Sequence, residues 1–253
     1  YGLKKNTYKY FFFKNLEKYI FNISKSIICL TFHSQNIIIN QYNISKKKIS
    51  VIPTCVDTNY FKSINQNKNT DFTKIVYLGT TKGAYDISKI LLNFKSLISA
   101  NKNYYLTVIT KDDHSELNNK FIKANISNSF YKIISLDRNK LVNELSYNDI
   151  GIFYLNENFS IQASFPTKIA EFLSLGIPII CNNFNEDINF YINQYEVGII
   201  YNFKEDLKNN FNNIIDKIKS NKNIKKNCRN LAKQKLSLDY SFNKYQMIYD
   251  NLK

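Results

Sequence analysis

The chain has 253 residues, a hydrophobic fraction of 44% and a formal net charge of +15. This hydrophobic fraction is ordinary for a globular core and excludes global disorder, and the length fits one large domain or one domain with part of another. The sequence opens on Tyr1 rather than Met, so we expect its natural N-terminus to be missing.

The positive charge comes almost wholly from lysine, since arginine occurs only at Arg138 and Arg229. Arginine is the preferred side chain for paired hydrogen bonds to phosphates and to base edges, and its scarcity disfavours a specific nucleic-acid partner. Lys, Asn and Ile are abundant throughout the chain and share AT-rich codons, so the base composition of the gene can explain the excess of lysine without any ligand. Scattered lysines are sufficient for a weak attraction to an anionic membrane surface.

The cysteines, at positions 29, 55, 181 and 228, have no metal-binding or redox spacing. Reduced thiols and a cytoplasmic location are the natural interpretation. His33 and His114 lie far apart in the sequence with no ligand pattern around them, so we expect no metal site. No signal peptide is visible and no apolar run approaches the length of a membrane span. A peripheral position at the inner membrane face remains compatible with this sequence.

The first predicted element is a helix over Tyr8–Phe21, which mixes aromatic residues with lysines. Leu16, Tyr19 and Ile20 form a helical apolar face. This pattern fits either a helix buried against a larger body or an amphipathic helix that contacts a membrane.

Short elements follow this helix. Apolar runs at Ser26–Thr31 and Ile49–Ile52 predict short buried parallel strands. Between them, Ser34–Tyr42 reads as a helix that Ser34 can cap. The polar stretch Lys62–Thr73 has the composition of a linker or surface loop.

From Lys74 onward, apolar strand-like runs alternate regularly with helical patterns. Strands are expected at Lys74–Leu78, Tyr104–Ile109, Tyr131–Leu136, Asp149–Leu155, Ile177–Cys181 and Val197–Tyr201. Helices are expected at Asp86–Ala100, Ser115–Ala124, Asn139–Ser146, Thr167–Leu175 and Glu186–Asn193, then at Lys204–Ser220, Asn223–Lys235 and Ser241–Leu252. Strict alternation predicts an α/β fold with a doubly wound parallel sheet and a helical C-terminus.

A glycine-rich loop directly follows the first strand of this series. It reads Gly79-Thr80-Thr81-Lys82-Gly83. Two glycines allow close approach of a backbone to a ligand, and the hydroxyls and the lysine suit a diphosphate. A plain strand-to-helix turn explains the same residues equally well.

A second candidate is the helix start around Pro166, Thr167 and Lys168. Proline fits the first helical turn, and the free N–H groups of a helix start can hold an anion that Lys168 would neutralise. Glu171, three residues later, shares a helix face with Lys168 and could accept hydroxyls from a ribose. The simpler alternative is an exposed Lys–Glu pair.

The third candidate is the loop Ser135–Arg138, at the carboxyl end of another strand. Because ligands of open α/β sheets bind at such ends, Leu136, Asp137 and Arg138 could border a nucleobase. A simple helix cap formed by Asp137 is the alternative.

Taken together, these motifs resemble the C-terminal, donor-binding half of a family 4 (group 1) glycosyltransferase with the two-lobed GT-B fold. Ile49–Phe61 resembles the interdomain segment of that family, and Lys74–Gly83 resembles its strand and glycine loop. Thr167–Ile180 resembles the segment in which a Glu precedes a Gly and a Pro-Val/Ile strand; here these are Glu171, Gly176, Pro178 and Ile179.

The resemblance implies roles for individual residues. Glu171 would hold the ribose of the donor, and Lys168 with the Gly79–Gly83 loop would hold its diphosphate. The family often has a second Glu eight positions before the first, where this chain has Ala163. Some relatives carry a Pro-Ser/Thr-Lys form of the segment, which Pro166-Thr167-Lys168 matches.

The same resemblance implies a division of the chain. Residues 1–50 would be the tail of the N-terminal acceptor domain and 51–73 the interdomain linker. Residues 74–236 would be the nucleotide-sugar-binding domain, and 237–253 a helix that crosses back to the N-terminal lobe. The catalytic His of the family would lie in the absent part of the acceptor lobe.

The resemblance therefore implies a retaining glycosyltransferase that moves a sugar from a nucleoside-diphosphate donor to a cell-surface glycan or a lipid-linked acceptor. By the same resemblance it would need no metal ion or other cofactor, and this fragment alone is expected to be inactive. One alternative is a degenerate nucleotide-binding module without transfer activity, because Ala163 stands where a sugar-contacting Glu is expected. Another is a different GT-B enzyme such as an epimerase, for which the required carboxylates and histidines are not found.

Overall fold

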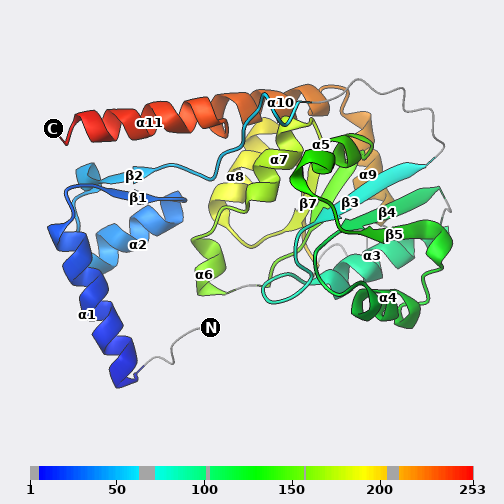
Figure 1. Cartoon of the computed structure of the whole chain (residues 1–253), viewed down its shortest axis with the longest axis horizontal. Coiled ribbons are helices and arrows are strands. Elements are labelled where there is room, and N and C mark those ends of the chain that lie inside the picture. The colour runs from blue at the N-terminus through cyan, green and yellow to red at the C-terminus, as the bar shows by residue number, and fades with distance from the viewer. Residues whose placement is uncertain (1–5, 63–71, 101–102, 157, 204–210, 253) are drawn as a thin grey trace.

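The computed structural model describes residues 6–62, 72–100, 103–156, 158–203 and 211–252. Two parts are visible in Figure 1: a small N-terminal lobe and a larger α/β domain. The lobe consists of α1 (Tyr8–Ile23), β1 (Ile27–Cys29), α2 (Phe32–Tyr42), a short 3-10 turn (Lys46–Lys48) and β2 (Ile49–Val51). Its strands pair in parallel, and a small apolar cluster that includes Ile27, Ile38 and Ile49 lies between them and α2.

The larger domain is built on a parallel sheet of six strands, as the sequence predicts. In chain order they are β3 (Thr73–Leu78), β4 (Tyr104–Ile109), β5 (Tyr131–Ile134), β6 (Ile150–Phe153), β7 (Ile179–Asn182) and β8 (Gly198–Tyr201). Their order in the sheet is β5-β4-β3-β6-β7-β8. Strands β6 and β7 are buried along their whole length, which explains their continuous apolar sequences.

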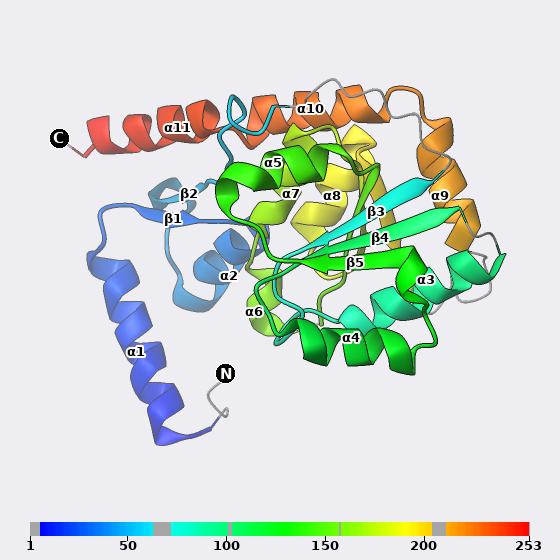
Figure 2. The same cartoon turned by 45° about the vertical axis from the view of Figure 1, so that its right-hand side comes forward.

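Helices cover both faces of this sheet (Figure 2). They are α3 (Ile87–Ala100), α4 (His114–Lys123), α5 (Arg138–Ser146), α6 (Phe159–Gln162), α7 (Thr167–Ser174), α8 (Glu186–Tyr195) and α9 (Phe211–Ser220), with a 3-10 turn at Asn128–Phe130. In Figure 2, α3 and α4 lie on one side of the strands, and α5, α7 and α8 lie on the other. The sheet is therefore doubly wound.

The strand order reverses direction at β3. The chain runs from β3 outward through β4 to β5, then returns to β6 and continues to β8 on the other side. Such a switch point leaves a crevice at the carboxyl ends of the two central strands, where ligands of this architecture bind. The glycine loop follows β3, so it lies at this crevice.

Two long helices, α10 (Ile224–Lys235) and α11 (Leu238–Asp250), end the chain. They run along one edge of the molecule, and α11 reaches the small lobe (Figure 1). The ammonium of Lys244 donates to the carbonyl of Val51 at 3.3 Å, which ties α11 to β2. No helix among the described residues is long and apolar enough to cross a membrane.

Some element boundaries differ from the sequence-based expectation. Helix α2 begins at Phe32 and is capped by the hydroxyl of Thr31, not by Ser34. The four-residue helix α6 was not predicted, because so short an apolar period is not recognisable in a sequence. The first part of the helix expected at Lys204–Ser220 lies outside the described residues, and α9 occupies the rest.

Candidate functional site

The most unusual side chain of the crevice is Lys168, in the first turn of α7. It is only 7% exposed. Its ammonium lies 3.8 Å from the ring centroid of Tyr85, 4.8 Å from that of Tyr77 and 5.4 Å from that of Phe153. Three aromatic faces thus surround one cation, an arrangement that stabilises positive charge.

The Lys168 ammonium has no hydrogen-bond partner among the described residues. Burial lowers its pKa to about 7, and the nearby carboxyl of Glu171 acts in the opposite direction. The ammonium also lies against Gly79, where an added Cβ would be 3.0 Å from it. A buried, unpaired cation beside a backbone without a side chain is suited to receive an anionic ligand.

Glu171 lies one turn further along α7 and is partly buried. Burial raises the pKa of its carboxyl, against the opposing charges of Arg138 and Lys168. Arg138, the first residue of α5, is held by Tyr60, whose hydroxyl donates to its carbonyl at 2.7 Å and whose ring lies 5.8 Å from its guanidinium. The structure therefore brings Glu171 and Arg138, which are distant in sequence, into one electrostatic neighbourhood.

The hydroxyls of the glycine loop are occupied by a carboxylate that the sequence analysis did not single out. Asp112, after β4, accepts from both threonines: from the Thr80 hydroxyl at 2.9 Å, and from the Thr81 amide and hydroxyl at 2.6 and 2.9 Å. Lys82 points outward and pairs with Glu116 at 2.6 Å. In this arrangement Thr80, Thr81 and Lys82 have partners within the chain, and these contacts order the loop.

The loop nevertheless keeps the backbone geometry that its glycines predict. Gly79 has φ +115° and Gly83 has φ +70°, conformations that other residues rarely adopt. The amide of Gly79 donates to the carbonyl of Ile109 at 2.9 Å, which fixes the turn to the end of β4. Gly79 thereby stays beside Lys168.

The entry to α7 is held by a hydrogen bond from the segment that follows β2. Pro166 occupies the N-cap position, one residue earlier than expected, and accepts from the amide of Ile169 at 3.0 Å. The hydroxyl of Thr54 donates to the carbonyl of Phe165 at 2.7 Å. Thr167, the first helical residue, is exposed.

The proposed nucleobase loop lies at the start of α5. Leu136 is half-buried against the core, and Asp137 is exposed at the N-cap position. The Asp137 side chain makes no capping hydrogen bond. Of these three residues, only Arg138 is electrostatically linked to Glu171.

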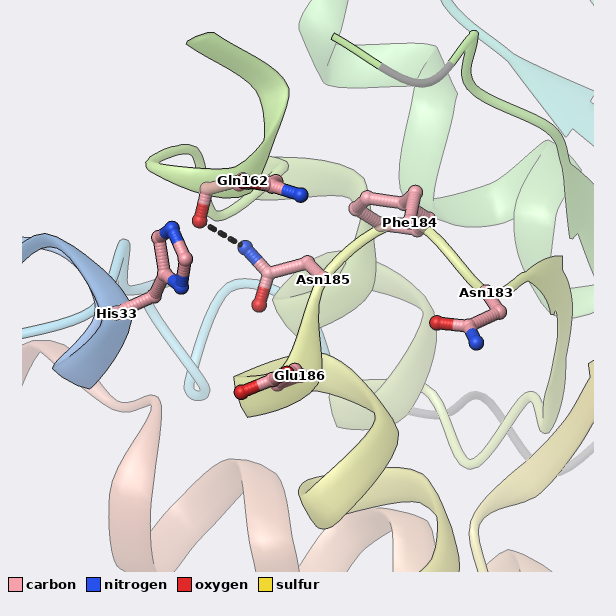
Figure 3. A pocket seen from close by; sticks show the side chains of 6 residues that line it. All are labelled: His33, Gln162, Asn183, Phe184, Asn185 and Glu186. Carbon is pink, nitrogen blue, oxygen red and sulfur yellow. Dashed lines mark hydrogen bonds between the residues drawn. The ribbon is translucent and has the colours of Figure 1, made fainter. Parts of the chain in front are cut away.

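A separate pocket of about 180 Å³ opens where the small lobe meets the larger domain. Its lining residues come from α2, α6, the loop after β7 and the first residue of α8 (Figure 3): His33, Gln162, Asn183, Phe184, Asn185 and Glu186. Two polar residues connect its walls: Asn185, the N-cap of α8, and Asp187 in its first turn. Asn185 donates to the carbonyls of Gln162 and Ser164 at 2.6 and 3.1 Å, and Asp187 accepts from the amides of Phe32 and His33 at 2.8 and 3.1 Å.

Among the described residues, no group of three or more His, Cys, Asp or Glu side chains is arranged to hold a metal ion. All four cysteines are free thiols. Cys181 and Cys228 are buried, and burial raises the pKa of each thiol, so neither is poised as a nucleophile.

A family model described as "Glycosyl transferases group 1" matches residues 60–235. No curated protein matches the sequence. A solved glycosyltransferase from Rickettsia africae is similar over 99% of this chain and 68% of its own, with 17% identity and a TM-score of 0.72. WaaG, a glycosyltransferase involved in lipopolysaccharide biosynthesis, is similar over 96% of this chain and 68% of its own, with 15% identity and a TM-score of 0.72. HepE from Anabaena, solved with UDP and glucose, is similar over 92% of this chain and 64% of its own, with 14% identity and a TM-score of 0.70. The chain thus spans about two thirds of the length of these structures and shares their fold.

Proposed function

The chain belongs to the group 1 glycosyl transferases, and on that premise we propose that it transfers a sugar from a nucleoside-diphosphate donor. Its fold is the GT-B fold of the glycosyltransferases to which it is similar. The donor would bind in the crevice at the carboxyl ends of β3 and β6, where open α/β sheets receive ligands.

One observation carries this proposal: the buried ammonium of Lys168, unpaired among the described residues, lies beside Gly79. A diphosphate placed over Gly79 would give Lys168 the hydrogen bonds that it lacks and would keep it charged. Glu171, on the same face of α7, would accept the ribose hydroxyls. Arg138, close to Glu171, would border the base.

The chemistry of transfer requires stabilisation of the departing diphosphate. Lys168 supplies a cation for that charge, together with the amides at the start of α7. We therefore propose a transfer that needs no metal ion or other cofactor. Retention of configuration at the sugar rests on the resemblance to family 4.

A uridine nucleotide is the first donor to test. HepE was solved with UDP and glucose, and pneumococcal GtfA, another similar structure, with UDP and GlcNAc. These ligands belong to those proteins, which are 14% and 12% identical to this chain. They support a search that begins with UDP sugars.

We propose an acceptor on a cell-surface glycan or lipid carrier, reached from the cytoplasmic side of an anionic membrane. The support is the surface of α1, which has no buried residue and exposes Phe11, Phe12, Phe13 and Tyr19 by 51% to 61%. Lysines flank these rings, as in helices that lie at membrane interfaces. Residues 1–50 would then belong to the acceptor lobe, 51–73 to the linker, 74–236 to the donor domain, and 237–253 to the returning helix.

The alternative function is a nucleotide-binding module without transfer activity. Ala163 favours it, because this position cannot supply the carboxylate that the family often places against the donor sugar. A module would use the same crevice and bind the same nucleotides. Only turnover separates the two functions.

Isothermal titration calorimetry with UDP, GDP and ADP tests the donor site. We expect micromolar binding of one nucleotide to the chain and its loss in Glu171→Ala, with Glu196→Ala, at the far end of α8, as the control that retains binding. Absence of binding to all three nucleotides by the folded chain would contradict the donor site. Release of nucleoside diphosphate from the matching nucleotide sugar, measured on the natural full-length protein, then distinguishes a transferase from a module.

A further inference from the structure

The polar groups of the glycine loop converge on one carboxylate oxygen, Oδ2 of Asp112. This oxygen accepts from the Thr81 amide at 2.6 Å, from the Thr81 hydroxyl at 2.9 Å and from the Thr80 hydroxyl at 2.9 Å. Burial alone would raise the pKa of the Asp112 carboxyl, but these hydrogen bonds hold it below its usual value. The loop therefore forms a small anion site that the chain itself fills.

Asp112 is in turn fixed to the edge of the sheet. Its amide donates to the hydroxyl of Thr110 at 3.1 Å, and the amide of Thr110 donates to the carbonyl of Ile134, the last residue of β5, at 2.9 Å. Thr110 is only 3% exposed. The carboxylate thus holds the loop from a rigid support.

The backbone anchors of the loop lie at its two ends. The amide of Gly79 bonds to the end of β4 at 2.9 Å, and the carbonyl of Ala84 accepts from the segment after β6 at 2.8 Å. Between these ends, the Lys82–Glu116 ion pair is about half exposed, and such pairs contribute little. The three hydrogen bonds to Asp112 are the firmest side-chain hold on the middle of the loop.

Tyr77 connects the same part of the loop to the buried lysine. Its hydroxyl donates to the carbonyl of Thr80, and its ring centre lies 4.8 Å from the ammonium of Lys168. Gly79 lies directly against that ammonium, with no room for a side chain between them. The conformation of Gly79 and Thr80 therefore determines how Lys168 is enclosed and what can reach it.

We propose that Asp112 is a positioning residue of the donor site: its carboxylate holds Thr80 and Thr81 so that Gly79 stays open against Lys168. That a diphosphate binds there rests on the proposed function; that Asp112 fixes the loop beside Lys168 does not. The role requires an acceptor oxygen and not a negative charge, because the charge repels an incoming diphosphate.

Two substitutions at Asp112 separate the acceptor from the charge. Asp112→Ala removes both, and we expect it to weaken binding of the preferred nucleoside diphosphate at least about tenfold, because the loop is no longer preorganised. Asp112→Asn keeps an acceptor oxygen of similar position and should stay within about threefold of the wild type. Calorimetry measures both affinities, and melting temperatures show whether the variants are folded.

A second pair of measurements needs no nucleotide. Hydrogen exchange followed by mass spectrometry reports on the amides of residues 79–85, and acetylation by acetic anhydride reports on access to Lys168. Both should be at least about fivefold faster in Asp112→Ala and close to wild type in Asp112→Asn, since loss of these hydrogen bonds lets the loop open locally.

Asp113→Ala is the matched control. Asp113 is the next residue and caps α4 through the amide of Glu116 at 2.9 Å, so its loss destabilises the helix without touching the loop hydrogen bonds. We expect wild-type nucleotide affinity, exchange at 79–85 and Lys168 acetylation in this variant. Equal effects in Asp113→Ala and Asp112→Ala, or effects in Asp112→Asn as large as in Asp112→Ala, would overturn the positioning role.

The two kinds of measurement distinguish this inference from the proposed function. Unchanged exchange and acetylation in Asp112→Ala would overturn the role of Asp112 even if the wild type binds a nucleotide. Absence of nucleotide binding by the wild type would instead contradict the donor site, while faster exchange and acetylation in Asp112→Ala would still support Asp112 as the residue that fixes the loop beside Lys168.

Discussion

The ammonium of Lys168 lies 3.8 Å from the centre of the Tyr85 ring, inside the larger domain. A cation over an aromatic face is stabilised, but that contact does not replace the hydrogen bonds lost with water. Tyr85 follows the glycine loop, and Lys168 begins α7, so the pair connects the two motifs that the sequence analysis placed at the donor site. An anionic ligand bound beside Lys168 would supply these hydrogen bonds.

Replacing Lys168 by Met should stabilise the unliganded protein while weakening nucleotide binding. Removing an unpaired buried charge is expected to raise the free energy of unfolding by about 1–3 kcal/mol, and the loss of a charged phosphate contact should lower affinity at least tenfold. Urea unfolding and calorimetry measure the two effects. Lys82→Met, on the exposed side of the loop, is the control and should change stability by less than about 1 kcal/mol.

The pH dependence of stability should reveal the same group. Burial lowers the pKa of Lys168 from 10.5 to about 7. Between these values the unfolded chain binds the extra proton, so the contribution of Lys168 to the free energy of unfolding rises with pH, by up to about 1.4 kcal/mol per unit. The stability gap between Lys168→Met and the wild type should therefore narrow from pH 7 to pH 9. An unchanged gap would contradict the buried ammonium.

Glu171 affects the pH dependence of stability in the opposite direction, and over a lower pH range. Burial raises the pKa of its carboxyl above 4.5, so its contribution to stability falls as pH rises through the folded-state pKa. Comparing Lys168→Met with the wild type leaves Glu171 present in both proteins. The narrowing above pH 7 can then be assigned to Lys168.

Gly79→Ala should disturb both the loop and the lysine. The φ of +115° is strained for alanine, and its Cβ would lie 3.0 Å from the Lys168 ammonium. We expect a loss of about 1–3 kcal/mol of stability and weaker nucleotide binding, measured by urea unfolding and calorimetry. Gly83→Ala is a matched control, since its Cβ would meet nothing within 4 Å; equal effects on nucleotide binding would count against the contact with Lys168.

The exposed face of α1 predicts binding to anionic vesicles. Phe12→Glu combined with Tyr19→Glu should reduce sedimentation with phosphatidylglycerol vesicles, because it removes two interfacial rings and adds negative charge. Leu92→Glu combined with Ile122→Glu, on α3 and α4, is the control, since these side chains are as exposed and lie elsewhere. Failure of the wild type to sediment with such vesicles would favour packing of α1 against protein.

The sheet could be predicted because its strands are continuous apolar runs. Tyr104–Ile109 is a strand with the expected bounds, whereas the expected strand Asp149–Leu155 is shorter, at Ile150–Phe153. Tyr154 and Leu155 are buried without extending the strand, and a sequence cannot separate burial from strand pairing. Pairing partners, and with them strand ends, depend on residues distant in the chain.

The same limit applies to the site. Lys168 and Glu171 were both proposed from a local motif. Lys168 is nevertheless buried rather than exposed, because three aromatic rings enclose it, one from β3, one from β6 and one from the segment between β3 and α3. Asp112 and Asp187 escaped the sequence analysis because their partners lie 31 and 155 residues away. Only a pattern of lone acidic residues after strands and at helix starts could have indicated them.

The central claim is that Lys168 binds the diphosphate of the donor. It is tested most directly by comparing the nucleoside diphosphate that binds best with its parent nucleoside, by calorimetry and competition, on the wild type and on Lys168→Met. The account predicts that Lys168→Met weakens the diphosphate at least tenfold and changes the affinity for the nucleoside less than about twofold. An equal loss for both ligands, or no loss for the diphosphate, would contradict it.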